Sequence, residues 1–142
     1  MYKRQLKNDL RQLGFDNVYA YGNHRKHWDS YVWTLIKCLK EYGDGYFDYV
    51  YLDGAHTIFH DLPAFYISKR LLRPGGIIDF DDYNWSWGGS PTMNPKNTPW
   101  VLDFMSDEQI DMKQVKLLVD EFVAKDPDFE VVKKNKVYRK RA

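Results

Sequence analysis

Two short apolar segments, each leading into acidic residues, constrain the fold of this chain more than any other feature. The first covers residues 47–52 and leads into Asp53, and the second covers residues 77–80 and leads into Asp81 and Asp82. Both have the composition of buried strands in a parallel sheet. Because ligands of open α/β sheets bind at the carboxyl edge of the strands, the three carboxylates predict one site there.

The rest of the chain alternates helical and strand patterns. We expect helices over residues 3–13, from 29 or 30 to 39, from about 57 to 72 and from 106 to 123, and strands over 18–21, 47–52, 77–80, 129–133 and 136–140. The alternation predicts an α/β fold with a mostly parallel sheet of about five strands and a C-terminal antiparallel hairpin. Residues 83–99 form a long loop, which is typical of a binding loop or lid.

Composition narrows the classes of function. At 142 residues the chain suits a single domain. Its net charge of +1 gives no argument for binding nucleic acid or an anionic membrane, and its apolar runs are too short to cross a bilayer. The lone cysteine, Cys38, cannot form an internal disulfide and is expected in the core. We therefore expect a cytoplasmic protein.

Three motifs point to one family. They are residues 47–56 (FDYVYLDGAH), residues 71–78 (LLRPGGII) and the run Asp81-Asp82-Tyr83. The chain from about residue 17 to 141 resembles class I S-adenosylmethionine-dependent methyltransferases, in the metal-dependent branch that includes sugar and natural-product O-methyltransferases. The resemblance implies a partial Rossmann-like fold and S-adenosylmethionine as cofactor. It also implies Mg²⁺ or a similar cation and a small hydroxyl compound as methyl acceptor.

The resemblance stops short of the family's N-terminal part. The family begins with a strand and a glycine-rich loop that hold the cofactor, and no counterpart precedes residue 17. We expect residues 1–142 to be one methyltransferase-like domain without those strands: a fragment, a split subunit or a trimmed relative. The connecting helices would then cover one sheet face only. We expect the other face, or the strand edge, to be buried by a second copy or a complementary chain.

The resemblance places a cation on Asp53, Asp81 and Asp82, whose oxygens suit Mg²⁺. It also assigns Asp53 to the cofactor site, and Asn23 to the position where the family contacts adenine. The alternative for each aspartate is a helix cap or an Asx turn, and for Asn23 an ordinary turn. His56 is the candidate general base, with a surface-loop histidine as the alternative.

Several further readings stay open. His56 and His60 have a spacing seen in zinc sites, although no glutamate follows the first histidine. Trp85, Trp87 and Trp100 suit a flat or sugar-like acceptor, or else a small core under the loop. The chain is accordingly an O-methyltransferase, a non-catalytic methyltransferase-like interaction module that needs a partner, or another carboxylate enzyme such as a metal-dependent phosphatase.

Overall fold

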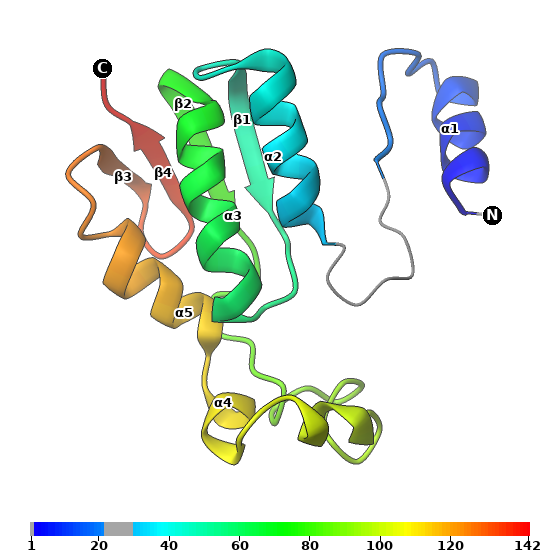
Figure 1. Cartoon of the computed structure of the whole chain (residues 1–142), viewed down its shortest axis with the longest axis vertical. Coiled ribbons are helices and arrows are strands. Elements are labelled where there is room, and N and C mark those ends of the chain that lie inside the picture. Colours follow the sequence, from blue (N-terminus) through cyan, green and yellow to red (C-terminus); the bar gives the residue numbers. More distant parts are fainter. Residues whose placement is uncertain (1, 22–29) are drawn as a thin grey trace.

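A parallel pair of strands, β1 (Phe47–Leu52) and β2 (Leu72–Phe80), forms one side of the sheet in the computed structural model, which describes residues 2–21 and 30–142. The strand order is β1-β2-β4-β3. Strands β3 (Phe129–Lys133) and β4 (Val137–Lys140) form an antiparallel hairpin, and β4 pairs antiparallel with β2 (Figure 1). The predicted α/β class, the first key strand and the C-terminal hairpin are confirmed.

Three of the helices lie on one side of this sheet. Figure 1 shows α2 (Tyr31–Tyr42), α3 (Ile58–Leu71) and α5 (Gln114–Leu118) in front of the strands, and α1 (Tyr2–Gln12) apart from them. The prediction that the connecting helices share one face is confirmed. On the opposite face, the side chains of Tyr49 and Tyr51 are 54% and 48% exposed.

The predicted number of strands is wrong for the part of the chain that the structure describes. The sheet has four strands rather than about five, and β1/β2 is its one parallel pair. The segment 18–21 is not a strand, although its residues favour extended backbone. Tyr19 and Tyr21 are exposed, and the hydroxyl of Tyr21 contacts that of Tyr42 at 3.1 Å. A strand needs a hydrogen-bonded neighbour, and this segment pairs with none of the described strands.

The predicted helix from 106 to 123 is broken into shorter pieces. A 3₁₀ turn (Pro99–Asp103) precedes α4 (Asp107–Asp111), whose predicted capping box between Ser106 and Gln109 is present. Met112 is extended, with ψ of 133°, and ends α4. Helix α5 follows and continues into a π turn (Val119–Val123). The break is stabilised by Gln114, whose side-chain amide donates to the carbonyl of Gln109 at 2.7 Å.

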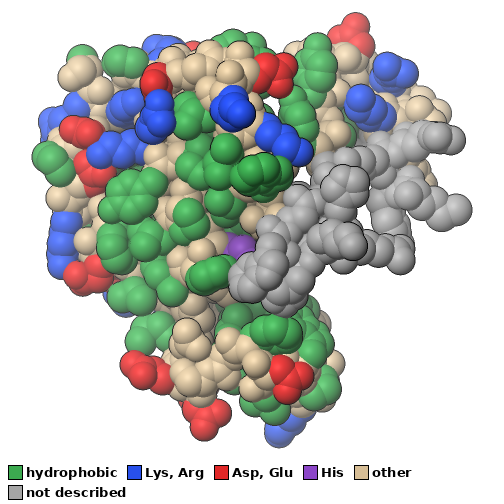
Figure 2. All heavy atoms as spheres, viewed as in Figure 1, with side chains coloured by type: hydrophobic (Ala, Val, Ile, Leu, Met, Phe, Trp, Pro, Cys, Tyr) green, Lys and Arg blue, Asp and Glu red, His purple; other side chains and the backbone are tan. Residues whose placement is uncertain are grey.

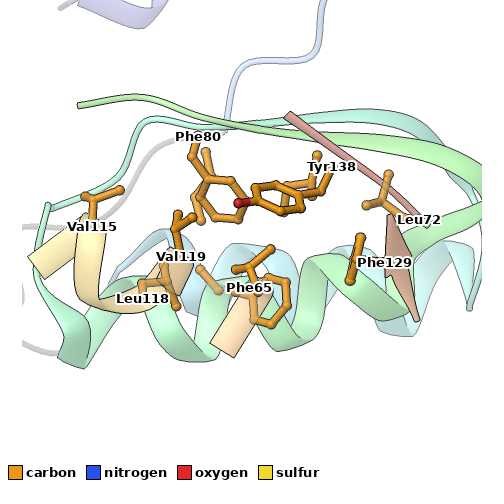
Figure 3. Close-up of a cluster of buried hydrophobic side chains, with 12 residues drawn as sticks. Phe65, Leu72, Phe80, Val115, Leu118, Val119, Phe129 and Tyr138 are labelled. Atoms are coloured by element: carbon orange, nitrogen blue, oxygen red, sulfur yellow. The ribbon is translucent and has the colours of Figure 1, made fainter. Parts of the chain in front are cut away.

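The main core lies between the inner sheet face and the helices α3 and α5. Figure 3 shows Phe65 of α3, Leu118 of α5 and Phe80 of β2 pointing toward one another, with Tyr138 beside them. Phe65, Leu118 and Phe80 are at most 1% exposed. Burial of such side chains contributes about 1.5–3 kcal/mol each. The core therefore fixes β2 against α3, and with it the end of β2 where the acidic residues begin.

A second, small core lies under the long loop. Trp87, Val101 and Ile110 are buried there, and Trp85 packs against them. This confirms the small core as one of the two readings of the tryptophans, although Trp100 is 50% exposed. In Figure 2 this part of the chain forms a lobe below the main body, with hydrophobic side chains on its surface. Cys38 is buried, as predicted.

Within residues 2–21 and 30–142, no helix combines the length and the apolar character needed to cross a membrane.

Candidate metal centre

The carboxyl ends of β1 and β2 lie side by side because the two strands are parallel and their last residues, Leu52 and Phe80, are paired. The pairing extends one step further, where the N–H of Asp81 donates to the carbonyl of Leu52 at 3.2 Å. Asp53 and Asp82 therefore leave neighbouring strands at the same edge of the sheet. This is the edge at which open α/β sheets bind ligands.

Three side chains converge there: the carboxylates of Asp53 and Asp82 and the imidazole of His56. The Nε2 atom of His56 lies 3.0 Å from Oδ2 of Asp82 and 3.5 Å from Oδ1 of Asp53. One ligand atom from each residue lies within 4.8 Å of the others. The imidazole is 15% exposed, and the carboxylates are 50% and 45% exposed. The group is thus shielded on the histidine side and open to solvent on the carboxylate side.

The backbone at two of these residues is unusual. His56 has a φ of 56° and Asp82 a φ of 52°, both in the left-handed region. Few residues other than glycine adopt it, and such conformations cluster at functional sites. The two left-handed residues interrupt the alternation that a continued strand would impose. Their side chains can therefore turn toward each other across the sheet edge.

Asp81, the third predicted metal ligand, is not part of this group. Its carboxylate interacts with the hydroxyl of Tyr51, and Oδ1 lies 4.0 Å from Nζ of Lys136. The hydrogen bond from Tyr51, together with Lys136, lowers the pKa of Asp81 below its usual value. On the same face, Lys136 lies 3.1 Å from Oδ1 of Asp79, whose other oxygen accepts from Tyr49. The charge of Asp81 is already balanced by protein groups.

Tyr51→Phe tests this assignment through the acidity of Asp81. Without the phenol donor, the pKa of Asp81 should rise toward about 3.9, the usual value for aspartate. Because the native pKa is lowered, the hydrogen bond stabilises the fold above the unfolded-state pKa, and this stabilisation is lost as the pH falls through the native pKa. Carboxyl ¹³C NMR titration measures the shift. Tyr49→Phe, which removes the donor to Asp79, is the control and should leave the Asp81 titration unchanged.

The histidine pair with zinc-like spacing does not converge on one point. The Nδ1 atom of His60 lies 2.9 Å from the hydroxyl of Thr57, and its ring packs against Phe59 with ring centroids 5.1 Å apart. His56 instead packs against Trp85, with centroids 5.0 Å apart. The ring contact joins the candidate centre to the small core under the long loop.

Sequence reasoning missed a buried carboxylate behind the turn that carries His56. Asp61 is 3% exposed and accepts a short hydrogen bond from the hydroxyl of Tyr31. The same hydroxyl accepts the N–H of Ala55 at 3.2 Å. Burial raises the pKa of both Asp61 and Tyr31. The available signal was an acidic residue one turn after Ile58 on the apolar face of a predicted helix, where a solvated aspartate would not be expected.

A cleft of about 350 Å³ opens beside Asp53, along the side of β1 that has no strand neighbour among the described residues. Leu35 and Val50 contribute apolar surface, and Thr34 and Ser68 contribute hydroxyl groups. The hydroxyl oxygen of Ser68 is buried and has no hydrogen-bond partner within the described parts of the chain. The volume lies within the range of about 300–1,000 Å³ typical of small-molecule sites.

The remaining predicted site residue, Asn23, lies outside the described residues, as does Gly22 beside it. The structure therefore brings together Asp53, Asp82 and His56, and places Asp81 with Tyr51 and Lys136.

In comparisons with known proteins, no family model matches the sequence and no curated protein matches it significantly.

Proposed function

We propose that this chain is the metal-binding portion of a Rossmann-like, S-adenosylmethionine-dependent O-methyltransferase. The observation that carries the proposal is the convergence of Asp53, His56 and Asp82 at the carboxyl ends of two parallel strands. The cleft beside Asp53 adds room for a small ligand next to these groups. The sequence motifs supply the reaction class, and the geometry supplies groups with the chemistry that this reaction needs.

The donor set fits a divalent cation. Two carboxylates from neighbouring strands suit Mg²⁺, which takes few protein ligands and retains several waters, and the half-exposed positions of Asp53 and Asp82 leave room for them. Carboxylate and water ligands also suit Mn²⁺, so the imidazole of His56 is not needed as a ligand. Such an ion orients the acceptor oxygens and lowers the pKa of the acceptor hydroxyl.

His56 is the base in this proposal. Its Nε2 atom is 3.0 Å and 3.5 Å from the two carboxylates. Once a cation occupies those oxygens, Nε2 would be able to accept a proton from a hydroxyl bound beside them. With acceptor and S-adenosylmethionine bound, Nε2 would take the acceptor O–H proton as the methyl group moves from sulfur to the acceptor oxygen, with the electron pair of the broken carbon–sulfur bond remaining on sulfur. Asp82 stabilises the imidazolium that results.

The cofactor would occupy the cleft that ends at Asp53. Leu35 and Val50 can pack against its apolar parts, and Thr34 carries a hydroxyl group beside them. Among the described residues, no strand pairs with β1 on the side where the cleft lies. In this proposal the remaining wall comes from another polypeptide segment, so the chain alone binds cofactor more weakly than the completed site.

Binding of Mn²⁺, followed by electron paramagnetic resonance, tests the metal site. The wild-type chain should bind one ion saturably, and the double variant Asp53→Asn/Asp82→Asn should lose that binding because the two charged ligands become neutral amides. Asp79→Asn, on the outer sheet face, is the matched control and should bind as the wild type does. Calorimetry with S-adenosylmethionine, with and without Mn²⁺, then tests the cofactor.

Two results would count against the proposal. Absence of saturable Mn²⁺ binding by the wild-type chain removes the metal site. Retention of binding by the double variant shows that the ion lies elsewhere.

A non-catalytic interaction module is the second candidate, and the exposed aromatic side chains favour it. Tyr49, Tyr51 and Trp33 are each about half exposed, at 54%, 48% and 52%. On one side, β1 pairs with no other described strand, so its backbone groups there are available to an added strand. This candidate is a domain that assembles with a second copy or a complementary chain. Sedimentation equilibrium tests self-assembly, and a strictly monomeric chain at high micromolar concentration would contradict the second-copy form.

A further inference from the structure

Asp61 is a buried carboxylate that the reaction proposed above does not use. It lies in the first turn of α3 and is 3% exposed. It accepts a hydrogen bond from the hydroxyl of Tyr31, which in turn accepts the N–H of Ala55 at 3.2 Å. The backbone N–H of Asp61 donates to the carbonyl of Thr57 at 2.9 Å. Ala55 and Thr57 flank His56. The carboxylate is therefore connected to one side of the candidate base through Tyr31, and the backbone of Asp61 is bonded to the other side.

The turn lies directly against this carboxylate. A Cβ atom at Gly54 would lie 2.1 Å from Oδ1 of Asp61 and 2.6 Å from the hydroxyl oxygen of Tyr31. Only a glycine can bring the backbone this close to both groups. Tyr31 is the first residue of α2, and Asp61 lies in the first turn of α3. The turn is therefore fixed at the point where two helices and the end of β1 meet.

The protein retains a charge-bearing group at a site where burial disfavours the charge. Burial is the largest influence on Asp61 and raises its pKa, and the hydrogen bond from Tyr31 opposes this rise only in part. Buried carboxylates are costly unless they are fully hydrogen-bonded, so stability alone gives little reason for this one. A role in fixing the local backbone geometry would explain why the carboxylate is present.

We propose that Asp61 is the positioning residue of the candidate metal centre. With Tyr31, it holds the turn from Gly54 to Thr57 in the conformation that directs His56 toward Asp82. The inference rests on the metal site proposed above and adds the reason why its groups converge before any ion is bound. Groups behind metal ligands commonly have this function, and removing them weakens metal affinity about 10–100-fold.

Two substitutions remove this support in different ways. Asp61→Asn keeps the shape of the side chain but puts an N–H donor where the second carboxylate oxygen stood. Tyr31→Phe keeps the aromatic ring and removes only the hydroxyl that joins Asp61 to Ala55. Tyr49→Phe is the matched control, because its hydroxyl also donates to an aspartate, Asp79, at 3.0 Å, but on the outer sheet face.

The first readout is the conformation of the metal-free turn. In the wild-type chain, the three-bond coupling between the amide and α protons of His56 should report its φ of 56°. In Asp61→Asn and Tyr31→Phe, we expect this coupling and the shifts of residues 53–57 to change while the core signals stay in place. The second readout is Mn²⁺ affinity, which should fall about 10–100-fold in both variants and stay unchanged in Tyr49→Phe.

The two readouts separate failure of this inference from failure of the proposed function. If the wild-type chain binds Mn²⁺ and both variants bind it equally tightly, Asp61 does not position the metal centre, and the proposal of a metal site still stands. If the wild-type chain binds no Mn²⁺, the proposed function fails, and the metal-free coupling of His56 still decides whether Asp61 holds the turn. An unchanged coupling in Tyr31→Phe, the variant that best preserves packing, overturns the inference.

Discussion

Phe65→Ala should lower the free energy of unfolding by about 3–5 kcal/mol, the usual cost of removing a buried phenylalanine ring. Phe65 is completely buried and connects α3 to two parts of the sheet. Its ring centroid lies 6.3 Å from that of Phe80 in β2 and 5.7 Å from that of Phe129 in β3. Truncation leaves a cavity in the main core of a protein whose total stability is expected to be about 5–15 kcal/mol.

Denaturation with urea, followed by circular dichroism, measures this effect. Phe59→Ala is a matched control, because Phe59 lies on the same helix and is 65% exposed. Its truncation changes little buried surface and should cost far less. If the two variants had similar midpoints, α3 would not pack on the sheet through Phe65, and the described core would be wrong.

Local patterns predicted the elements that carry their own signals. The strand β1 lies where its apolar run predicted, and the capping box between Ser106 and Gln109 forms as the sequence indicates. The hairpin turn has Asn135 at a φ of 62°, which suits a residue type that tolerates left-handed backbone. In each case the physical cause lies within a few residues of the chain.

Elements that depend on distant partners were predicted less well. Residues 18–21 have strand-forming side chains but pair with no strand in the part of the chain that the structure describes, and pairing is not visible in the segment itself. The apolar pattern from Ser106 to Val123 is continuous, yet the helix breaks at Met112. There the buried side chain of Gln114 bonds the N–H of Ile58 at 2.8 Å and the carbonyl of Gln109 at 2.7 Å. The position of the helix break therefore depends on a contact between residues that are far apart in the sequence.

In the candidate site, too, the features set by local sequence were predicted and those set by distant contacts were not. The sequence placed Asp53, Asp81 and Asp82 at one sheet edge, but not the direction in which each carboxylate points. Lys136 arrives from the far end of the chain and lies beside Asp81, so its position could not be read from the two strands alone. The left-handed backbone of His56 brings the predicted base among the predicted ligands.

Gly54→Ala should disrupt both the fold and the candidate site, because the added methyl group has no room. Its Cβ would lie 2.1 Å from Oδ1 of Asp61 and 2.6 Å from the hydroxyl oxygen of Tyr31, and Asp61 is only 3% exposed. Overpacking of this kind costs about 1–3 kcal/mol, and separating the buried hydrogen-bonded pair costs about 1–3 kcal/mol more. We expect a lower unfolding midpoint and weaker Mn²⁺ binding together.

Gly89→Ala is the control for this substitution. Its nearest neighbour would be the side-chain oxygen of Ser86 at 3.0 Å, in the long loop, and that side chain can move. Such a surface change should stay within about 0.5 kcal/mol of the wild type. The two effects of Gly54→Ala have one cause, the displaced turn, so they should appear together. A variant that unfolds early yet binds Mn²⁺ normally would show that the close contact of Gly54 with Asp61 stabilises the fold without shaping the metal site.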